Sequence, residues 1–210
     1  MDDTERLLNV GLVPILRLHD PDVALAAGQA MAEAGLRAVE VTATVPGASE
    51  VIAKLAASLE GSEVLLGAGT VLTPAQAEEF VDAGARFLVS PVLDQDMMHA
   101  ARRLGVPHVP AGFTPTELFT AHRAGAPLVK LFPAAVVGPE YLSAFRGPLP
   151  EIRIICTGGL VPETALEFIR AGATVVGLGG RLCPQRMDEV EEAASAAADL
   201  LRLIDAEQRR

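Results

Sequence analysis

Short apolar stretches recur along the chain, and most of them follow a glycine that ends a more polar, helix-like stretch. Glycine commonly ends helices because it adopts the left-handed conformation at no steric cost. Eight apolar stretches have the length of a strand, namely 13–17, 36–42, 64–70, 86–91, 106–110, 127–133, 152–157 and 173–180. The pattern therefore predicts eight strands that alternate with helices.

Helix starts support this count. Asp20 is followed by Pro21, an N-cap residue followed by proline at the first helical position. Thr73–Gln76 and Thr114–Glu117 both have the form of a capping box, again with proline in second place. A short helix is expected over 4–10, before the first strand, and a last helix over 187–205.

Strands that alternate with helices pair in parallel, and eight such units in one domain are what a closed (β/α)8 barrel requires. We therefore predict an α/β chain folded as a (β/α)8 TIM barrel with a short N-terminal helix. An open doubly wound sheet is the alternative, but that fold has no need of eight regular units. No linker, low-complexity stretch or charge block interrupts the pattern, so residues 1–210 are expected to form one domain.

Composition narrows the possible partners. Hydrophobic residues make up 50% of the chain and aromatics only 4%, which suits strands covered on both faces by helices. The formal net charge of −10 argues against a nucleic-acid or anionic-membrane partner, since either would favour a basic surface. The acidic, polar start and the lack of a long apolar run predict a cytoplasmic protein. Cys156 and Cys183 are expected to be reduced, and the scattered histidines indicate no metal site.

Reactive groups of such a barrel lie at the carboxyl ends of its strands. Lys130 interrupts the apolar run 128–133, where burial would lower its pKa and leave a neutral amine that attacks ketones. The alternative is a lysine that reaches water or pairs with a carboxylate. Glu40 lies inside a predicted strand, which makes it a candidate general base with a raised pKa, or else a structural partner of Lys130 or Arg17.

Glycine pairs end the last two predicted strands. Gly158–Gly159 follow Thr157, and Gly179–Gly180 precede Arg181. Glycines expose backbone N–H groups, and the loops after strands seven and eight are the usual phosphate-binding place in this fold. The alternative is two tight turns that need a permissive backbone. Arg181 either adds charge there or points outward.

The chain resembles the class I aldolases that cleave 2-keto-3-deoxy-6-phosphogluconate (KDPG), its galactonate epimer or 4-hydroxy-2-oxoglutarate (KHG). The likeness extends from about residue 10 to about residue 200. It rests on the segments Val39–Thr42, Gly67–Leu72, Val89–Pro91, Thr114–Glu117, Val129–Pro133 and Thr157–Gly159.

The resemblance implies that Lys130 forms a Schiff base with a 2-keto acid and that Glu40 is the acid/base. It assigns substrate binding to Arg17, Thr70, Pro91, Phe132, Thr157, Gly158, Gly159, Gly179 and Gly180. Arg17 and Thr70 would hold the carboxylate, Pro91 and Phe132 would shape the site, and the glycines would hold phosphate. The imine replaces a metal as electron acceptor, so no cofactor is expected. The resembling family forms homotrimers.

Two positions depart from the family. Thr44 stands where gluconate-type enzymes usually carry an arginine, and Gly179–Arg181 lacks a serine that the family commonly offers to phosphate. Arg17 and the segment Gly138–Tyr141 resemble the corresponding residues of the galactonate-type branch, which favours a galactonate-type substrate. The alternatives are a 4-hydroxy-2-oxoglutarate aldolase, a phosphate-binding isomerase or epimerase that uses Glu40 as base, and a sugar-phosphate-binding protein without activity.

Overall fold

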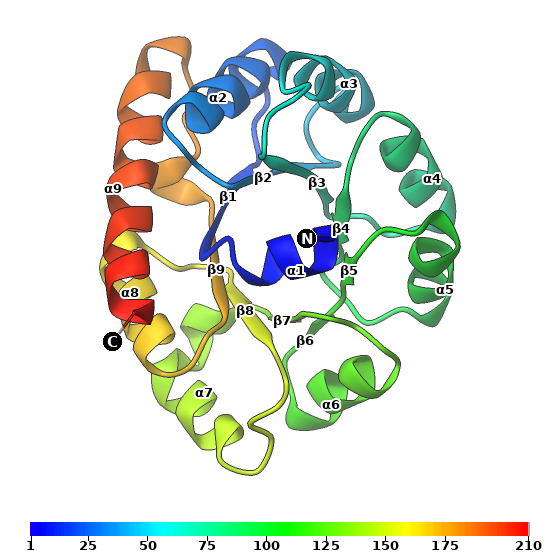
Figure 1. Ribbon diagram of the computed structural model, residues 1–210, viewed down its shortest axis with the longest axis vertical. Coiled ribbons are helices and arrows are strands. Elements are labelled where there is room, and N and C mark those ends of the chain that lie inside the picture. The colour runs from blue at the N-terminus through cyan, green and yellow to red at the C-terminus, as the bar shows by residue number, and fades with distance from the viewer. Residues whose placement is uncertain (210) are drawn as a thin grey trace.

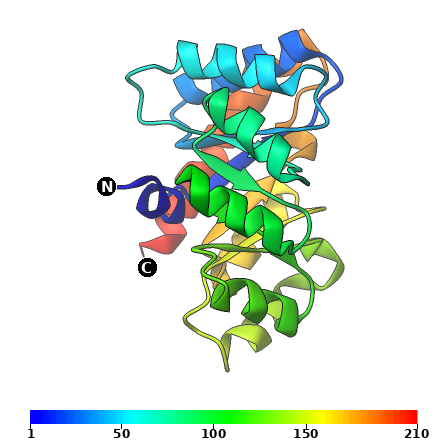
Figure 2. The ribbon, with the colours of Figure 1, turned by 90° about the vertical axis from the view of Figure 1, so that its right-hand side faces the viewer.

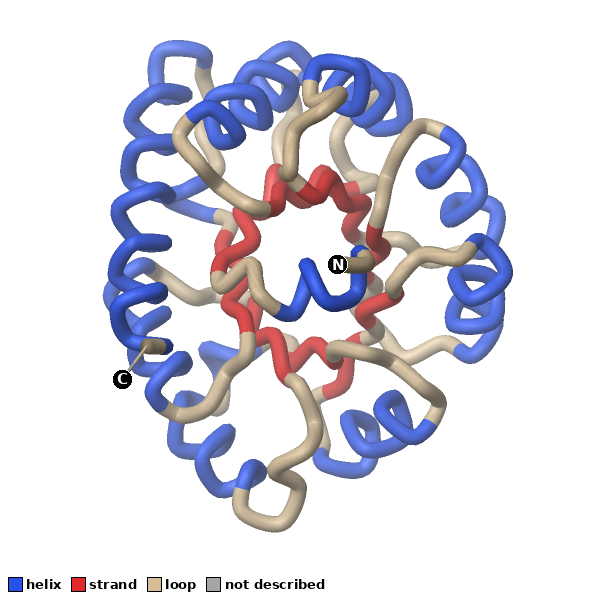
Figure 3. Tube along the Cα trace, in the orientation of Figure 1, coloured by secondary structure: helices blue, strands red, loops and turns tan. Residues whose placement is uncertain are grey.

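Parallel strands form a ring inside a ring of helices in the computed structural model, which describes residues 1–209 (Figures 1 and 3). The strands are β1 Leu12–Leu16, β2 Ala38–Thr42, β3 Leu65–Gly69, β4 Phe87–Val89, β5 His108–Val109, β6 Ala111–Gly112, β7 Val129–Leu131, β8 Ile154–Thr157 and β9 Val175–Leu178. They pair in the order β5-β4-β3-β2-β1-β9-β8-β7-β6. The predicted (β/α)8 barrel is confirmed.

The helices follow the strands in the expected alternation. They are α1 Asp3–Leu8, α2 Pro21–Glu33, α3 Ala48–Ser58, α4 Pro74–Asp82, α5 Gln95–Leu104, α6 Pro115–Arg123, α7 Gly138–Arg146, α8 Pro162–Arg170 and α9 Val190–Gln208. Three short 3-10 helices add to them: η1 Ala134–Val136, η2 Gly180–Leu182 and η3 Met187–Glu189. None of the described helices combines the length and apolar character that crossing a bilayer demands.

The fifth predicted strand differs from expectation. Instead of ending at Pro110, it continues to Gly112, so that β5 and β6 are two halves of one strand. Pro110 separates the halves because it has no N–H to donate to a neighbouring strand. Its carbonyl accepts a hydrogen bond from the Lys130 N–H at 2.9 Å, which keeps the ring continuous with β7.

One of the two predicted capping boxes forms completely, and the other forms only in part. Thr114 and Glu117 form the predicted reciprocal capping box at the start of α6. At α4, the Thr73 hydroxyl accepts from the Gln76 N–H, but the Gln76 side chain accepts from the Leu72 N–H instead of the cap residue's own N–H. The Thr73 cap is therefore one-sided.

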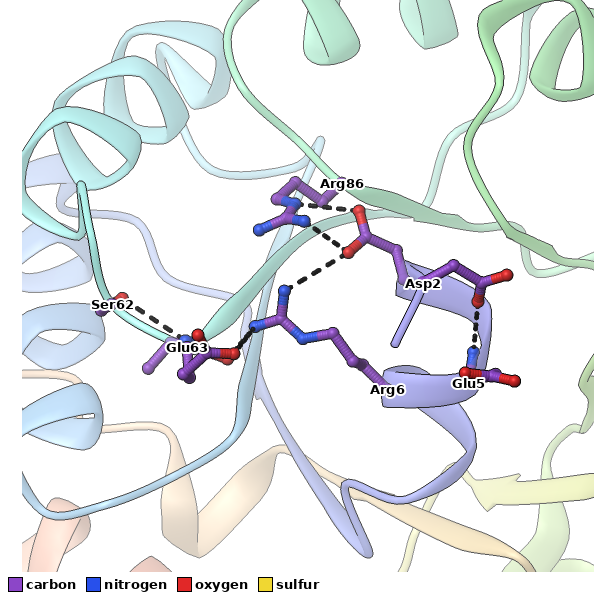
Figure 4. A network of polar contacts seen from close by, with 8 residues as sticks. Asp2, Glu5, Arg6, Ser62, Glu63 and Arg86 are labelled. Carbon is purple, nitrogen blue, oxygen red and sulfur yellow. Dashed lines mark hydrogen bonds and ion pairs between the residues drawn. The ribbon is translucent and has the colours of Figure 1, made fainter.

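Helix α1 covers the N-terminal end of the barrel, the end that faces the viewer in Figure 1 and lies at the left in Figure 2. Leu7 and Val10 pack into the apolar cluster inside the ring. Asp3 accepts from the Arg86 guanidinium, with the Nε bond at 2.9 Å, and Arg6 pairs with Glu63 at 3.0 Å (Figure 4). Apolar side chains of this N-terminal segment thus close this end of the ring as a plug, and the ion pairs of Asp3 and Arg6 form an ionic rim around it.

Candidate active site

Lys130 and Glu40 both point into the ring. Alternate residues of a strand face the same side, and Leu128 and Ala38, two residues before them, belong to the apolar cluster inside the barrel. Lys130 lies in β7 and is 5% exposed, whereas Glu40 lies in β2 and is 1% exposed. Two ionisable side chains from separate strands therefore share one largely water-free interior.

Burial opposes the charge on both groups. It raises the pKa of Glu40, against the lowering effect of the Lys130 and Arg17 charges. Burial also lowers the pKa of Lys130, and Arg17 lowers it further, whereas the Glu40 carboxylate raises it. The field of Glu40 thus favours a charged lysine, and burial favours a neutral one. Such opposed effects bring a lysine pKa toward the range in which an amine is an effective nucleophile.

The structural ion-pair alternative is not what the geometry shows. Neither Glu40 nor Lys130 has an ion pair within 4.0 Å among residues 1–209, and Glu40 Oε2 is buried without a hydrogen-bond partner. Thr157 Oγ1, also inside the ring, is a second buried polar atom without a partner. Buried polar atoms are nearly always paired, so two unpaired ones in one interior are available for a ligand.

Phe132 lies beside the lysine amine. Lys130 Nζ is 4.7 Å from the centroid of the Phe132 ring, which is the arrangement of a cation–π contact. The Gly158 backbone approaches the same ring so closely that a Cβ there would lie 2.7 Å from Phe132 Cδ2. The aromatic ring is thereby held between the amine and the first glycine pair, where it would favour a positive charge on the lysine nitrogen.

Glycine at the end of β3 makes room for the catalytic candidate. A Cβ on Gly69 would lie 1.7 Å from Glu40 Oε1, so only glycine permits the present position of the carboxylate. The structure therefore gives Gly69 a space-making role that no sequence pattern marks.

Arg17 and Thr70 meet at the carboxyl ends of β1 and β3. The Arg17 Nη2 donates to Thr70 Oγ1 at 3.1 Å. Thr70 has a φ of 59°, a left-handed conformation that is rare for a β-branched residue and costs on the order of 1 kcal/mol or more. This backbone strain, held beside an exposed guanidinium, is typical of a site where a side chain is positioned for a ligand.

Cys183 is a residue whose role sequence reasoning missed. Its thiol accepts from the Arg17 N–H at 3.1 Å and donates to the Arg17 carbonyl at 3.6 Å. It therefore ties the loop after β9 to the end of β1, and burial raises its pKa so that it remains a thiol. A cysteine after a Gly-Gly turn carries no signal of this contact.

The remaining predicted residues line the same end of the barrel. Pro91 is half-buried just after β4, and Gly158–Gly159 lie between β8 and α8. Gly179 lies between β9 and η2, and Gly180 is the first residue of η2. Arg181 points outward, because its guanidinium pairs with Glu163 at 3.2 Å and both side chains are mostly exposed.

Thr44 also lies at this end. Thr42 Oγ1 donates to the Leu16 carbonyl at 3.1 Å and is 2.8 Å from Thr44 Oγ1. Because the Thr42 hydroxyl has only one proton, Thr44 is the donor between the two. Among the described residues, no group of three or more His, Cys, Asp and Glu side chains gathers as a metal site would require.

A barrel whose interior carries both a desolvated lysine and a carboxylate has the construction of a lysine-dependent aldolase. The model of the "KDPG and KHG aldolase" family matches residues 4–198, nearly the whole chain. The chain belongs to this family, and it is a class I aldolase, a carbon–carbon lyase.

Individual relatives agree with the family match. The chain is 36% identical to the 2-dehydro-3-deoxy-6-phosphogalactonate aldolase of Escherichia coli K12, covering 89% of this chain and 91% of that protein. It is also 36% identical to the 2-dehydro-3-deoxy-phosphogluconate aldolase of Treponema pallidum, covering 84% and 83%. A solved KDPG aldolase of Legionella pneumophila, with pyruvate captured as a covalent carbinolamine, aligns with a TM-score of 0.83 at 26% identity, covering 97% and 98%.

Proposed function

We propose that Lys130 is the imine-forming lysine and Glu40 the proton carrier of an aldolase that acts on 2-keto-3-deoxy-6-phospho sugar acids. The observation that carries the proposal is the shared burial of these two groups inside the ring, with the Lys130 pKa lowered and the Glu40 pKa raised. Buried ionisable groups with shifted pKa values cluster at functional sites.

In this mechanism the neutral Lys130 amine attacks the C2 ketone and forms a carbinolamine, which loses water to give an iminium. Glu40, through a water, removes the C4 hydroxyl proton. The C3–C4 bond breaks, its electrons pass to the iminium as an enamine, and the aldehyde leaves. The proton returns to C3, and hydrolysis of the resulting imine frees pyruvate and Lys130. For a 6-phosphorylated substrate the aldehyde is glyceraldehyde 3-phosphate.

The ends of the substrate would be held by different parts of the barrel mouth. We assign the carboxylate to Arg17 and Thr70, whose existing contact presents a preformed cationic and hydroxyl pair. The unpaired Thr157 hydroxyl would bind a polar group near the reacting carbons. Pro91 and Phe132 shape the site. The phosphate is assigned to backbone N–H groups of the loops containing Gly158, Gly159, Gly179 and Gly180.

The galactonate-type substrate is our first choice. Thr44 offers a hydroxyl, already hydrogen-bonded to Thr42, where gluconate-type enzymes usually carry an arginine. The gluconate epimer and unphosphorylated 4-hydroxy-2-oxoglutarate are the other candidates, because relatives named for either sugar acid are 36% identical to this chain and the matching family is named for KHG as well. An assay of pyruvate release from all three compounds separates them. Faster turnover of the gluconate epimer would reverse our assignment.

Reductive trapping tests the lysine directly. The chain contains only two lysines, Lys54 on the surface of α3 and Lys130 in the ring, so the site of labelling is easily assigned. Incubation with pyruvate and borohydride should add irreversible mass to the peptide that contains Lys130. Labelling of Lys54 alone, or no labelling, would remove Schiff-base chemistry from this protein. Turnover that survives Lys130→Met would instead favour an isomerase or epimerase with Glu40 as base.

We also propose that the working protein is a homotrimer of single-domain chains that needs no metal. Two large apolar side chains in the C-terminal part of the chain, Met187 and Leu203, are more than half exposed, and burial between copies would stabilise them. Sedimentation should give three copies, and one cooperative unfolding transition should be seen. Activity should persist after dialysis against a chelator, whereas a loss that zinc or magnesium restores would contradict the metal-free mechanism.

A further inference from the structure

A polar cavity of about 530 Å³ lies at the N-terminal end of the barrel, remote from the aldolase site. Its charged lining comes from elements far apart in the sequence: the start of β2, the end of α7, the start of β8 and the end of α9. The charged side chains are Arg37, Arg146, Arg153, Asp205 and Arg209. Four guanidinium groups against one carboxylate give a local formal charge of +3 in a chain of net charge −10.

Two of the arginines are fixed by the fold. Arg37 donates two hydrogen bonds to Asp205, at 2.9 and 2.5 Å, and Arg146 Nη1 donates to the Ile152 carbonyl at 2.9 Å. The single acid of the cavity is therefore already occupied. Fixed guanidinium groups lose little conformational freedom when a ligand arrives, so their remaining N–H donors are preorganised.

The other two arginines have no partner among residues 1–209. Arg153 and Arg209 make no side-chain hydrogen bond or ion pair with any of the residues 1–209. Each presents five N–H donors in a planar fork that matches the oxygens of phosphate and carboxylate groups. Four like charges around one cavity repel one another, and an anion with more than one negative charge would relieve that repulsion.

We propose that this cavity binds a small oxyanion that carries at least two negative charges. Phosphate esters and polycarboxylates both fit this description, because tetrahedral phosphate groups and planar carboxylate groups present oxygens that match a guanidinium fork. The site is separate from the phosphate loops of the proposed active site. Arg153 immediately precedes β8 and Gly158 immediately follows it, which puts roughly 17 Å of strand between them at 3.3 Å per residue. Leu8 and Asn9, at the end of α1, also line the cavity.

Inorganic pyrophosphate is a suitable probe because it is small and multiply charged. We would titrate the full-length protein with it at constant ionic strength, using amide resonances as position-specific reporters. Saturable shifts are expected at Arg153, Thr174 and Asp205. In the double variant Arg153→Ser/Arg209→Ser, the apparent affinity for pyrophosphate that these shifts report should fall about tenfold or more, since charge-assisted hydrogen bonds are lost. Shifts at Gly158 and Gly180 report the active-site loops and should be unaffected.

The matched control is Arg103→Ser/Arg123→Ser, which removes the same number of positive charges from exposed arginines outside the cavity. It should bind pyrophosphate as the unmodified protein does, and thermal melting checks that both double variants fold. The proposal is overturned if only the active-site loops shift, if no resonance shifts saturably, or if the two double variants weaken binding equally. The last result would mean that net charge, and not this cavity, attracts the anion.

Discussion

Two layers of side chains inside the ring, only two residues apart on the same strands, differ in character. Toward the N-terminal end the layer is entirely apolar: Val13, Ala38, Leu65, Phe87, Val109, Leu128, Ile155 and Val175. Two positions further along the same strands come Ile15, Glu40, Gly67, Val89, Ala111, Lys130, Thr157 and Gly177. One layer is a packed core closed by α1, and the next contains charges, an unpaired hydroxyl and glycines.

The difference shows which layer of the barrel contributes favourably to the free energy of folding and which layer opposes folding. Burying apolar side chains contributes about 25 cal/mol per Å², so the first layer and the α1 plug favour folding. The second layer contains buried polar atoms without partners, which oppose folding. The ionic rim around α1 is partly exposed, and such pairs contribute little. The apolar layer therefore supports the strained, polar layer in which the chemistry takes place.

The largest expected effect comes from removing the amine of the polar layer. Lys130→Met keeps the length of the side chain but cannot form an imine, so pyruvate release should fall about 10⁴-fold or more. The apolar layer is untouched, so the variant should still fold. Steady-state assays with the preferred sugar acid, together with thermal melting, measure both properties.

Lys54→Met is the matched control, since Lys54 is exposed on α3 and is the only other lysine in the chain. It should keep full turnover and the single pyruvate-borohydride label. If Lys130→Met unfolds the protein, or if Lys54→Met reduces turnover as strongly, the contrast between a chemical layer and a structural layer is lost.

At two neighbouring glycines of β3, the same substitution would disturb a side chain of the polar layer in one case and of the apolar layer in the other. A Cβ on Gly69 would lie 1.7 Å from Glu40 Oε1, whereas a Cβ on Gly67 would lie 2.2 Å from the Phe87 ring. Gly69→Ala should therefore displace the carboxylate and lower kcat about 100-fold, because small misplacements of a catalytic group are costly. Gly67→Ala should overpack the core and cost about 1–3 kcal/mol of unfolding free energy.

Urea unfolding and turnover, measured on both variants, check this contrast. The expected pattern is crossed: Gly69→Ala loses more activity than stability, and Gly67→Ala loses more stability than activity. Equal losses of both properties in both variants would show that the two layers act as one packed unit.

The spacing of apolar stretches and the positions of the glycines that end helices predicted the fold well. Alternating apolar stretches and stop glycines gave all eight strands, because these signals are local to the chain. Pro110 misled the prediction of the fifth strand, since a proline can lie within a strand where its carbonyl alone is used. The candidate residues were found because Lys130 and Glu40 interrupt apolar runs. The Gly69–Glu40 contact and the Cys183–Arg17 bonds were not found, because they join residues far apart in the sequence.

The Cys183–Arg17 contact predicts a smaller effect, on binding. Cys183→Ala removes both hydrogen bonds to the Arg17 backbone, so the guanidinium assigned to the substrate carboxylate is held less firmly. The loss of about 1 kcal/mol should raise KM about fivefold, with little change in kcat. Cys183→Ser keeps a donor and an acceptor at the same place and should restore KM. A fall in kcat alone, or no rescue by serine, would contradict a positioning role.

The smallest effect is a displacement of a pH profile. Burial lowers the Lys130 pKa; Glu40 opposes this by raising it, and Arg17 lowers it further. Imine formation needs the neutral amine, so its rate rises with pH through the pKa of Lys130. Glu40→Gln removes the charge that stabilises the ammonium, so the Lys130 pKa falls further and the rise moves to lower pH. Arg17→Met removes a repelling charge, so the Lys130 pKa increases and the rise moves to higher pH.

The measurement is the rate of borohydride-trapped labelling at saturating pyruvate over a pH series, and only the position of the rise is compared. Saturation matters because Arg17 is also assigned to the carboxylate, so Arg17→Met is expected to weaken pyruvate binding as well. Lys54→Met should leave the profile where it is. Displacements of both variants in the same direction would mean that the charges of Glu40 and Arg17 do not act on the lysine as the polar layer requires, and that burial alone sets its pKa.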